Sequence, residues 1–199
     1  MKGEESYDEL LRELNLARDL LLLAKLKEIR EEIRSIRPLA ILRDEFGPIR
    51  KALREFSDQV YEKALPLILV FSVATLEKFL RSIWEERFGA IGKNLTRVFS
   101  DPKEFAKASK QRVRKEIGPF TFKANAVAMK RHVILHKGGV VDPDALEVFR
   151  EAGILDIKLG EKLRLTAESV ERDMDTILEF AKKVKEVIYF DSGTAEANE

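Results

Sequence analysis

The sequence predicts an all-α protein, built as a bundle of amphipathic helices, and two observations support this. Apolar residues recur at steps of three and four along the chain, as they do on one face of a helix. Prolines and glycines divide the chain into segments of helical length. Partly alternating apolar residues occur near 154–166, around Gly160-Glu161, which indicates a possible small β-hairpin. We therefore expect a helical bundle carrying at most this one hairpin.

The first 60 residues are expected to form an N-terminal helical extension, which either packs into the same bundle or contributes to a dimer. Residues 5–37 are predicted to form one helix that ends at Pro38. Its apolar side chains recur on a single stripe, which comprises Leu22, Leu26, Ile29, Ile33 and Ile36. A second helix is predicted over 49–88, in which Pro66 should introduce a kink or begin a new first turn.

Residues 61–190 are predicted to form the main helical domain. Its central helix should be Leu67–Phe88, the most apolar stretch of the chain, with Phe71, Leu76, Phe79, Leu80, Ile83 and Trp84 in the core. Further helices are expected to start at Ser100-Asp101-Pro102 and end near Gly118-Pro119, then to cover 122–137 after a Thr121 cap, 143–152, and 167–190 after a Thr166 cap. Residues 191–199 are expected to be a disordered tail.

Composition restricts the classes of protein. The 199 residues include no cysteine, so disulfides, thiol catalysis and cysteine-ligated zinc are excluded. The N-terminal sequence lacks the apolar core of a signal peptide, and the apolar runs are too short to span a bilayer. The sequence therefore predicts a cytoplasmic protein without a membrane partner.

Charge is unevenly distributed along the chain. The net charge is +1, but residues 91–137 hold twelve Lys or Arg and three acids, a local charge of +9 that leaves −8 on the remainder. Such a segment favours a polyanionic partner such as RNA, and equally fits a solvated helix face. The candidate RNA-binding residues are Arg112, Arg114, Lys115, Lys123, Lys130 and Lys137.

The candidate reactive residues lie at the end of the basic segment. The two histidines of the chain, His132 and His136, follow Arg131 closely. Histidine changes its protonation near neutrality, and arginine binds phosphate through paired hydrogen bonds, which suits phosphodiester cleavage. A His-x3-His metal pair is a rival interpretation, which the surrounding cations disfavour, and the third is a cationic cluster that stabilises a helix C-terminus.

The segment Arg131-His132-Val133-Ile134-Leu135-His136 resembles the Arg-x4–6-His motif of HEPN domains. The following Gly138-Gly139 turn and the helix around Ala74–Leu80 are also similar to members of this family, and the resemblance covers about residues 60–190. It implies an up-and-down helical core, and Arg131 and His136 as the catalytic pair with His132 orienting them. Glu77 is a further candidate, with an ion pair on the core helix as the alternative.

The resemblance also implies an activity and partners. HEPN domains usually form homodimers in which two motifs face each other, and cleave RNA without a metal or other cofactor, leaving a 2′,3′-cyclic phosphate. A toxin- or defence-related endoribonuclease is therefore expected, with an antitoxin or nucleotidyltransferase as a candidate partner. Two positions depart from the pattern: Lys137 replaces a common Asn, and Gly138 replaces a Tyr found in one subset.

Two other functions remain open on the sequence alone. The first is a non-catalytic HEPN-like module that binds RNA, a nucleotide or a partner protein. The second is a helical scaffold that assembles through residues 5–37. Retained RNA binding without cleavage would distinguish the binding module from the enzyme, and its steep salt dependence would implicate the basic segment.

Overall fold

The structure is a computed structural model that describes residues 2–34, 47–89 and 98–190. Within these ranges the chain forms six helices: α1 (Lys2–Arg34), α2 (Gly47–Phe88), α3 (Pro102–Ala108), α4 (Gln111–His136), α5 (Pro143–Glu151) and α6 (Ala167–Phe190). The prediction of an all-α bundle is confirmed. Among the described residues, no helix is both long enough and apolar enough to cross a bilayer.

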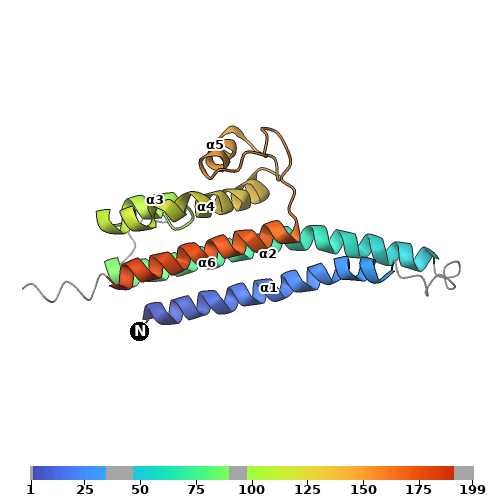
Figure 1. Cartoon of the computed structure of the whole chain (residues 1–199), viewed down its shortest axis with the longest axis horizontal. Helices are drawn as coiled ribbons and strands as arrows, with labels where there is room; N and C mark the ends of the chain where they lie inside the picture. The colour runs from blue at the N-terminus through green and yellow to red at the C-terminus, as the bar shows by residue number, and fades with distance from the viewer. Residues whose placement is uncertain (1, 35–46, 90–97, 191–199) are drawn as a thin grey trace, which may run out of the picture.

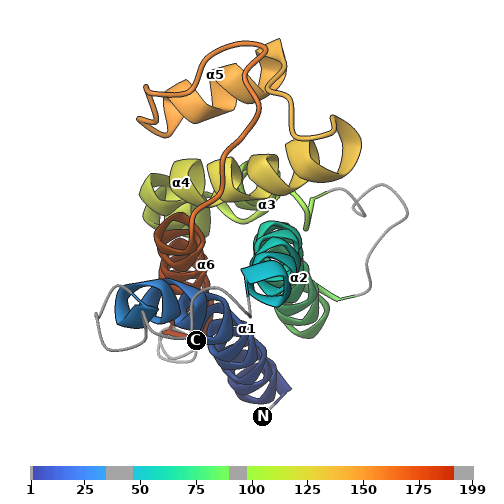
Figure 2. The same ribbon diagram turned by 90° about the vertical axis from the view of Figure 1, so that its right-hand side faces the viewer.

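Three long helices, α1, α2 and α6, pack together, and α4 packs against α2 and α6. Helices α1, α2 and α6 run alongside one another, as Figure 1 shows, and α3 and α4 cover one side of this group. Viewed along the long axis, α4 lies over α2 and α6, and α5 packs on its outer side (Figure 2). Helix α4 is therefore the middle layer, and its C-terminal end carries the Arg131–His136 segment.

The main core is formed where α1, α2, α4 and α6 meet. Leu10 and Leu14 of α1 lie in one buried cluster with Leu80 of α2, Ile117 of α4 and Phe180 of α6. Helix α1 therefore packs on the same core as the later helices. Among the side chains of α1 that the structure describes, Leu10, Leu14, Ala17 and Leu21 are buried, whereas Leu22 of the predicted stripe is 58% exposed.

Helix α4 is buried on two sides. Ile117 and Ala124 pack into the main core, whereas Ala126 and Val133 pack with Phe149 of α5 in a separate cluster. The small alanine side chains allow neighbouring elements to approach both faces of this helix. This double packing restricts the orientation of the Arg131–His136 segment.

The predicted helix boundary at Gly118-Pro119 is wrong. Both residues lie inside α4, and Thr121 is not a cap: its buried hydroxyl donates to the carbonyl of Gly118 at 2.7 Å. Buried side chains every three to four residues continue across the proline, so tertiary packing outweighs the lost backbone hydrogen bond. The break occurs instead at Ser109, where the backbone is extended.

Several other predictions can be compared with the helices. Pro66 lies within α2, which continues through it, so it does not begin a new helix. Of the expected core residues in this helix, Phe71 is 38% exposed and the others are buried. The Asp101-Pro102 start and the Thr166 cap are confirmed. The predicted tail at 191–199 and helix end at Pro38 lie outside the described residues.

The predicted hairpin at 154–166 does not form in this fully described stretch. Its second half instead approaches the turn after α4, with one isolated antiparallel bridge between Val140 and Lys162. The backbone N–H of Val141 donates to Glu161 at 3.0 Å, and that of Leu163 donates to Gly139 at 2.8 Å. Pairing with the α4–α5 turn therefore satisfies backbone groups that a local hairpin would have paired.

Candidate functional site

The candidate site lies at the C-terminal end of α4, where the helix stops at the predicted place. The backbone N–H groups of Lys137 and Gly139 both donate to the carbonyl of Val133 at 3.0 Å. Gly138 and Gly139 have positive φ angles of 61° and 84°, which glycine adopts without steric cost. Because Val133 is fully buried, the helix end is held against α5 while its outer residues remain at the surface.

Arg131 is anchored by the neighbouring helix. Its Nη1 donates to Oε1 of Glu77 in α2 at 2.6 Å, and the two side chains are 26% and 24% exposed. Burial raises the pKa of the Glu77 carboxyl, and the nearby Arg131 and Arg81 oppose this increase. The Nε atom of Arg131 is buried without a hydrogen-bond partner within the described part of the chain. Glu77 therefore positions Arg131 and leaves part of its donor capacity unused.

The two histidines lie together on the surface. Their rings are 5.0 Å apart between centroids and inclined at 46°, and both residues are exposed. They are four positions apart in the sequence, so they lie on adjacent turns of one helix face. Arg131 and His136 are separated by about 140° around an ideal helix. Accordingly, the structure pairs His132 with His136, whereas Arg131 faces α2.

An acidic residue completes the surroundings of the histidines. Asp142, the N-cap of α5, accepts from the backbone N–H of Ala145 at 2.9 Å and lies 3.0 Å from Nζ of Lys137. The hydrogen bond from Ala145 and the positive charge of Lys137 lower the pKa of the Asp142 carboxyl, and His132 contributes in the same direction. Lys137 is thus engaged with Asp142 at the edge of the site.

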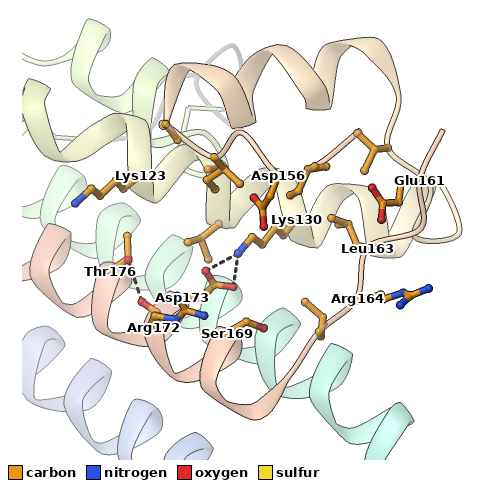
Figure 3. Close-up of a pocket in the computed structure, with 18 of the residues that line it drawn as sticks. Lys123, Lys130, Asp156, Glu161, Leu163, Arg164, Ser169, Arg172, Asp173 and Thr176 are labelled. Atoms are coloured by element: carbon orange, nitrogen blue, oxygen red, sulfur yellow. Dashed lines mark hydrogen bonds and ion pairs between the residues drawn. The ribbon is translucent and has the colours of Figure 1, made fainter. Parts of the chain in front are cut away.

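The other candidate RNA-binding residues do not gather at this site. Lys130 turns toward α6, where its Nζ lies 2.7 and 2.9 Å from the two carboxylate oxygens of Asp173 (Figure 3). Lys123 lies further along the same side of α4. Arg112, Arg114 and Lys115 are exposed in the first turns of α4. With a rise of 1.5 Å per residue, Lys115 lies roughly 30 Å from His136 along the helix.

Sequence reasoning missed two carboxylates with important contacts. The sequence predicts a helix that begins at 143, directly after Asp142, but does not place Asp142 near His132. Asp173 is 6% exposed on α6, and a charged residue close to the apolar stripe of a predicted helix was the signal that could have singled it out. Within the described ranges, His, Asp and Glu residues do not form a group of three or more that could hold a metal ion.

Comparison with known proteins found no matching family model, no similar curated protein and no similar solved structure. The arrangement of side chains is therefore the basis for the functional argument. It comprises an exposed histidine pair at a helix C-terminus, an anchored arginine on the next face, and a lysine–carboxylate pair at the edge. Such groups can exchange protons and bind phosphate.

Proposed function

We propose that this protein is a metal-independent endoribonuclease, toxin or defence related, with Arg131 and His136 as catalytic residues. The observation that supports this most directly is the exposed His132–His136 pair beside an arginine held in place by Glu77. Surface imidazoles can reach an RNA backbone, and an anchored guanidinium loses little conformational freedom when it contacts a phosphate. The resemblance of residues 131–136 to the HEPN motif supports the same assignment.

In the proposed reaction, one imidazole removes the proton from a ribose 2′-hydroxyl. The 2′-oxygen then attacks the adjacent phosphorus, and the bond from phosphorus to the 5′-oxygen of the next nucleotide breaks. A protonated imidazole gives its proton to that 5′-oxygen, so the products are a 2′,3′-cyclic phosphate and a 5′-hydroxyl. Arg131 stabilises the negative charge that develops on the phosphate oxygens. His132 orients the reacting groups.

We propose that the active form is a homodimer in which two α4 ends face each other. One His136 would act as the base while its counterpart acts as the acid, which gives both protonation states at one phosphate. Leu135 supports such a contact, because this apolar side chain is 48% exposed directly before His136. The proposal implies action in the cytoplasm, with an antitoxin or nucleotidyltransferase as the candidate partner that restrains the enzyme.

A non-catalytic module that binds RNA, a nucleotide or a partner protein is the second candidate function. Three ion pairs favour this second function, because they occupy cations of the candidate site. Arg131 is paired with Glu77, Lys130 with Asp173 and Lys137 with Asp142. Under this alternative, the Glu77–Arg131 pair only connects α2 to α4. Exposed Arg114 and Lys115 would then contact phosphates, and binding would weaken steeply with salt.

The experiment that separates the two functions follows cleavage of an end-labelled RNA in EDTA. Loss of a proton-transferring group should slow cleavage about 10²- to 10⁴-fold in His136→Ala. Arg131→Ala should also be impaired, whereas Lys182→Ala, which changes an exposed lysine on α6, should match wild type. If the folded wild-type protein binds RNA but does not cleave it, the result supports the binding module instead.

A further inference from the structure

A cleft lies between α4, α6 and the segment 152–165 (Figure 3). Its volume is about 650 Å³, which is in the range of pockets that bind small molecules. The described residues that line it do not include the Arg131–His136 segment. Much of its wall is apolar, and the aliphatic side chains there include Val127, Val141, Ile154, Ile157, Leu163 and Leu165. The cleft can therefore enclose an apolar group of a small ligand.

Two opposite charges lie side by side in the cleft. The Nζ of Lys130, on α4, donates to both carboxylate oxygens of Asp173, on α6, at 2.7 and 2.9 Å, and the two side chains are only 13% and 9% exposed. Both groups keep hydrogen-bonding capacity, because an ammonium carries three N–H donors and a carboxylate accepts about four hydrogen bonds. A hydrophobic pair would often stabilise the fold equally well, so stability alone does not explain this buried pair.

Two exposed charges lie near the buried pair. Arg172 precedes Asp173 on α6, and its positive charge acts on the Asp173 carboxyl, whose pKa it lowers against the larger effect of burial. Asp156 lies on the segment that closes the cleft opposite α6, and Figure 3 shows its carboxylate directed toward the pair of Lys130 and Asp173. Beside the apolar wall, a ligand in the cleft thus meets both signs of charge.

The paired charges restrict the chemistry of the ligand. A simple anion that approaches Lys130 also approaches Asp173, which repels it, and a simple cation is repelled by Lys130 in the same way. A molecule that carries both charges close together interacts favourably with both partners at once. An α-amino acid has this arrangement, since a single carbon joins its ammonium to its carboxylate. Its side chain can be apolar, which matches the wall of the cleft.

We propose that this cleft binds a free α-amino acid with a large apolar side chain. The carboxylate of the ligand accepts hydrogen bonds from Lys130 and Arg172, and its ammonium donates to Asp173 and Asp156. The side chain of the ligand lies against the apolar wall. Charge-assisted hydrogen bonds of this kind are strong where water is largely excluded. The site is separate from the candidate catalytic residues, so the proposal does not depend on the ribonuclease activity.

The test uses full-length protein and isothermal titration calorimetry with phenylalanine, leucine and glycine. Two further probes remove one charge each: N-acetylphenylalanine lacks the ammonium, and phenethylamine lacks the carboxylate. Phenylalanine or leucine should bind with a dissociation constant below about 1 mM. The single-charge probes should bind at least about tenfold more weakly, because each leaves one buried charge without its partner. Glycine should also bind at least about tenfold more weakly, because it buries no apolar side chain.

Variants of the lining residues test the individual contacts. Asp156→Asn and Arg172→Gln change exposed side chains, and each should weaken binding of the amino acid about tenfold. The double variant Lys130→Met with Asp173→Leu replaces the ion pair with apolar side chains, so it should fold and should not bind the amino acid. Lys182→Gln is the matched control for Arg172→Gln, since it removes an exposed charge of α6 outside the cleft and should leave binding unchanged.

Four results would overturn the proposal. The first is the absence of binding by both phenylalanine and leucine at concentrations up to about 1 mM. The second is binding of N-acetylphenylalanine or phenethylamine as tight as that of phenylalanine, which would indicate a site for a single charge. The third is equally tight binding of glycine, which would eliminate the role of the apolar wall. The fourth is equal weakening by Lys182→Gln and Arg172→Gln, which would indicate a diffuse charge effect.

Discussion

The buried pair of Lys130 and Asp173 gives a quantitative prediction about stability. Asp173→Ala removes two charge-assisted hydrogen bonds, of 2.7 and 2.9 Å, and leaves the ammonium of Lys130 in a site where its side chain is 13% exposed. Breaking a buried pair from one side typically costs about 3–5 kcal/mol. Because Lys130 lines an open cleft, its ammonium can recover some hydration, so we expect a loss of about 3 kcal/mol. This corresponds to a decrease in Tm of about 6–12 °C.

Urea denaturation followed by circular dichroism measures this loss. Replacing both partners, as in Lys130→Met with Asp173→Leu, should restore the free energy of unfolding to within about 1 kcal/mol of wild type. The surface pair of Lys107 and Glu104 is the control: its side chains are 47% and 48% exposed, so Glu104→Ala should cost about 0–1 kcal/mol. A loss below about 1 kcal/mol in Asp173→Ala would refute the reasoning.

The pH dependence of the single variant Lys130→Met adds a check on direction. Burial raises the pKa of Asp173 in the folded protein, and Lys130 opposes this increase. An acid with a raised folded pKa binds protons more readily in the folded state, so its unfavourable contribution disappears as the pH falls through that pKa. The destabilisation caused by Lys130→Met should therefore shrink on acidification. If the destabilisation caused by Lys130→Met grows as the pH falls, the buried position of Asp173 would be contradicted.

Two further predictions concern the candidate site. Glu77→Gln removes the charge that holds Arg131. We expect the free energy of unfolding in urea to fall by about 1 kcal/mol and RNA cleavage to become slower. Cleavage at the wild-type rate would argue against a positioning role for Glu77. Asp142→Asn keeps a capping side chain but removes the attraction to Lys137. Since the pKa of Asp142 is lowered in the folded protein, its stabilisation is present above its usual pKa of 3.8 and is lost as the pH falls through the folded value. The variant should be destabilised in urea at neutral pH, and its difference from wild type should shrink as the pH falls below 3.8. A difference that stays the same on acidification would contradict this charge effect.

Helix starts were predictable because they depend on neighbouring residues. Asp101 before Pro102 and Asp142 before Pro143 each combine a side-chain cap with a proline in the first turn, and both begin helices. The same local logic failed at Gly118-Pro119. There the burial of Ile117 and Ala124 against distant helices maintains one continuous helix. Local signals therefore predict boundaries only where tertiary packing does not override them.

The contents of the candidate site were predictable, but its contacts were not. Arg131 and the histidines could be located because they are close in sequence and precede two glycines. Their environment comes from elsewhere in the chain: Glu77 is 54 residues from Arg131, and Asp173 is 43 residues from Lys130. Spacing along one helix cannot show such pairs. For the same reason, the sequence could not show that Lys130, Arg131 and Lys137 contact carboxylates of three different parts of the fold.

The central claim is that His136 transfers protons during metal-free RNA cleavage. The most direct measurement is analysis of the product ends after wild-type protein and His136→Ala are incubated with RNA in EDTA. Our proposal predicts 2′,3′-cyclic phosphate ends from wild type and a rate lower by about 10²-fold or more in the variant. Equal cleavage by both proteins, or no cleavage by folded wild-type dimer, would contradict it.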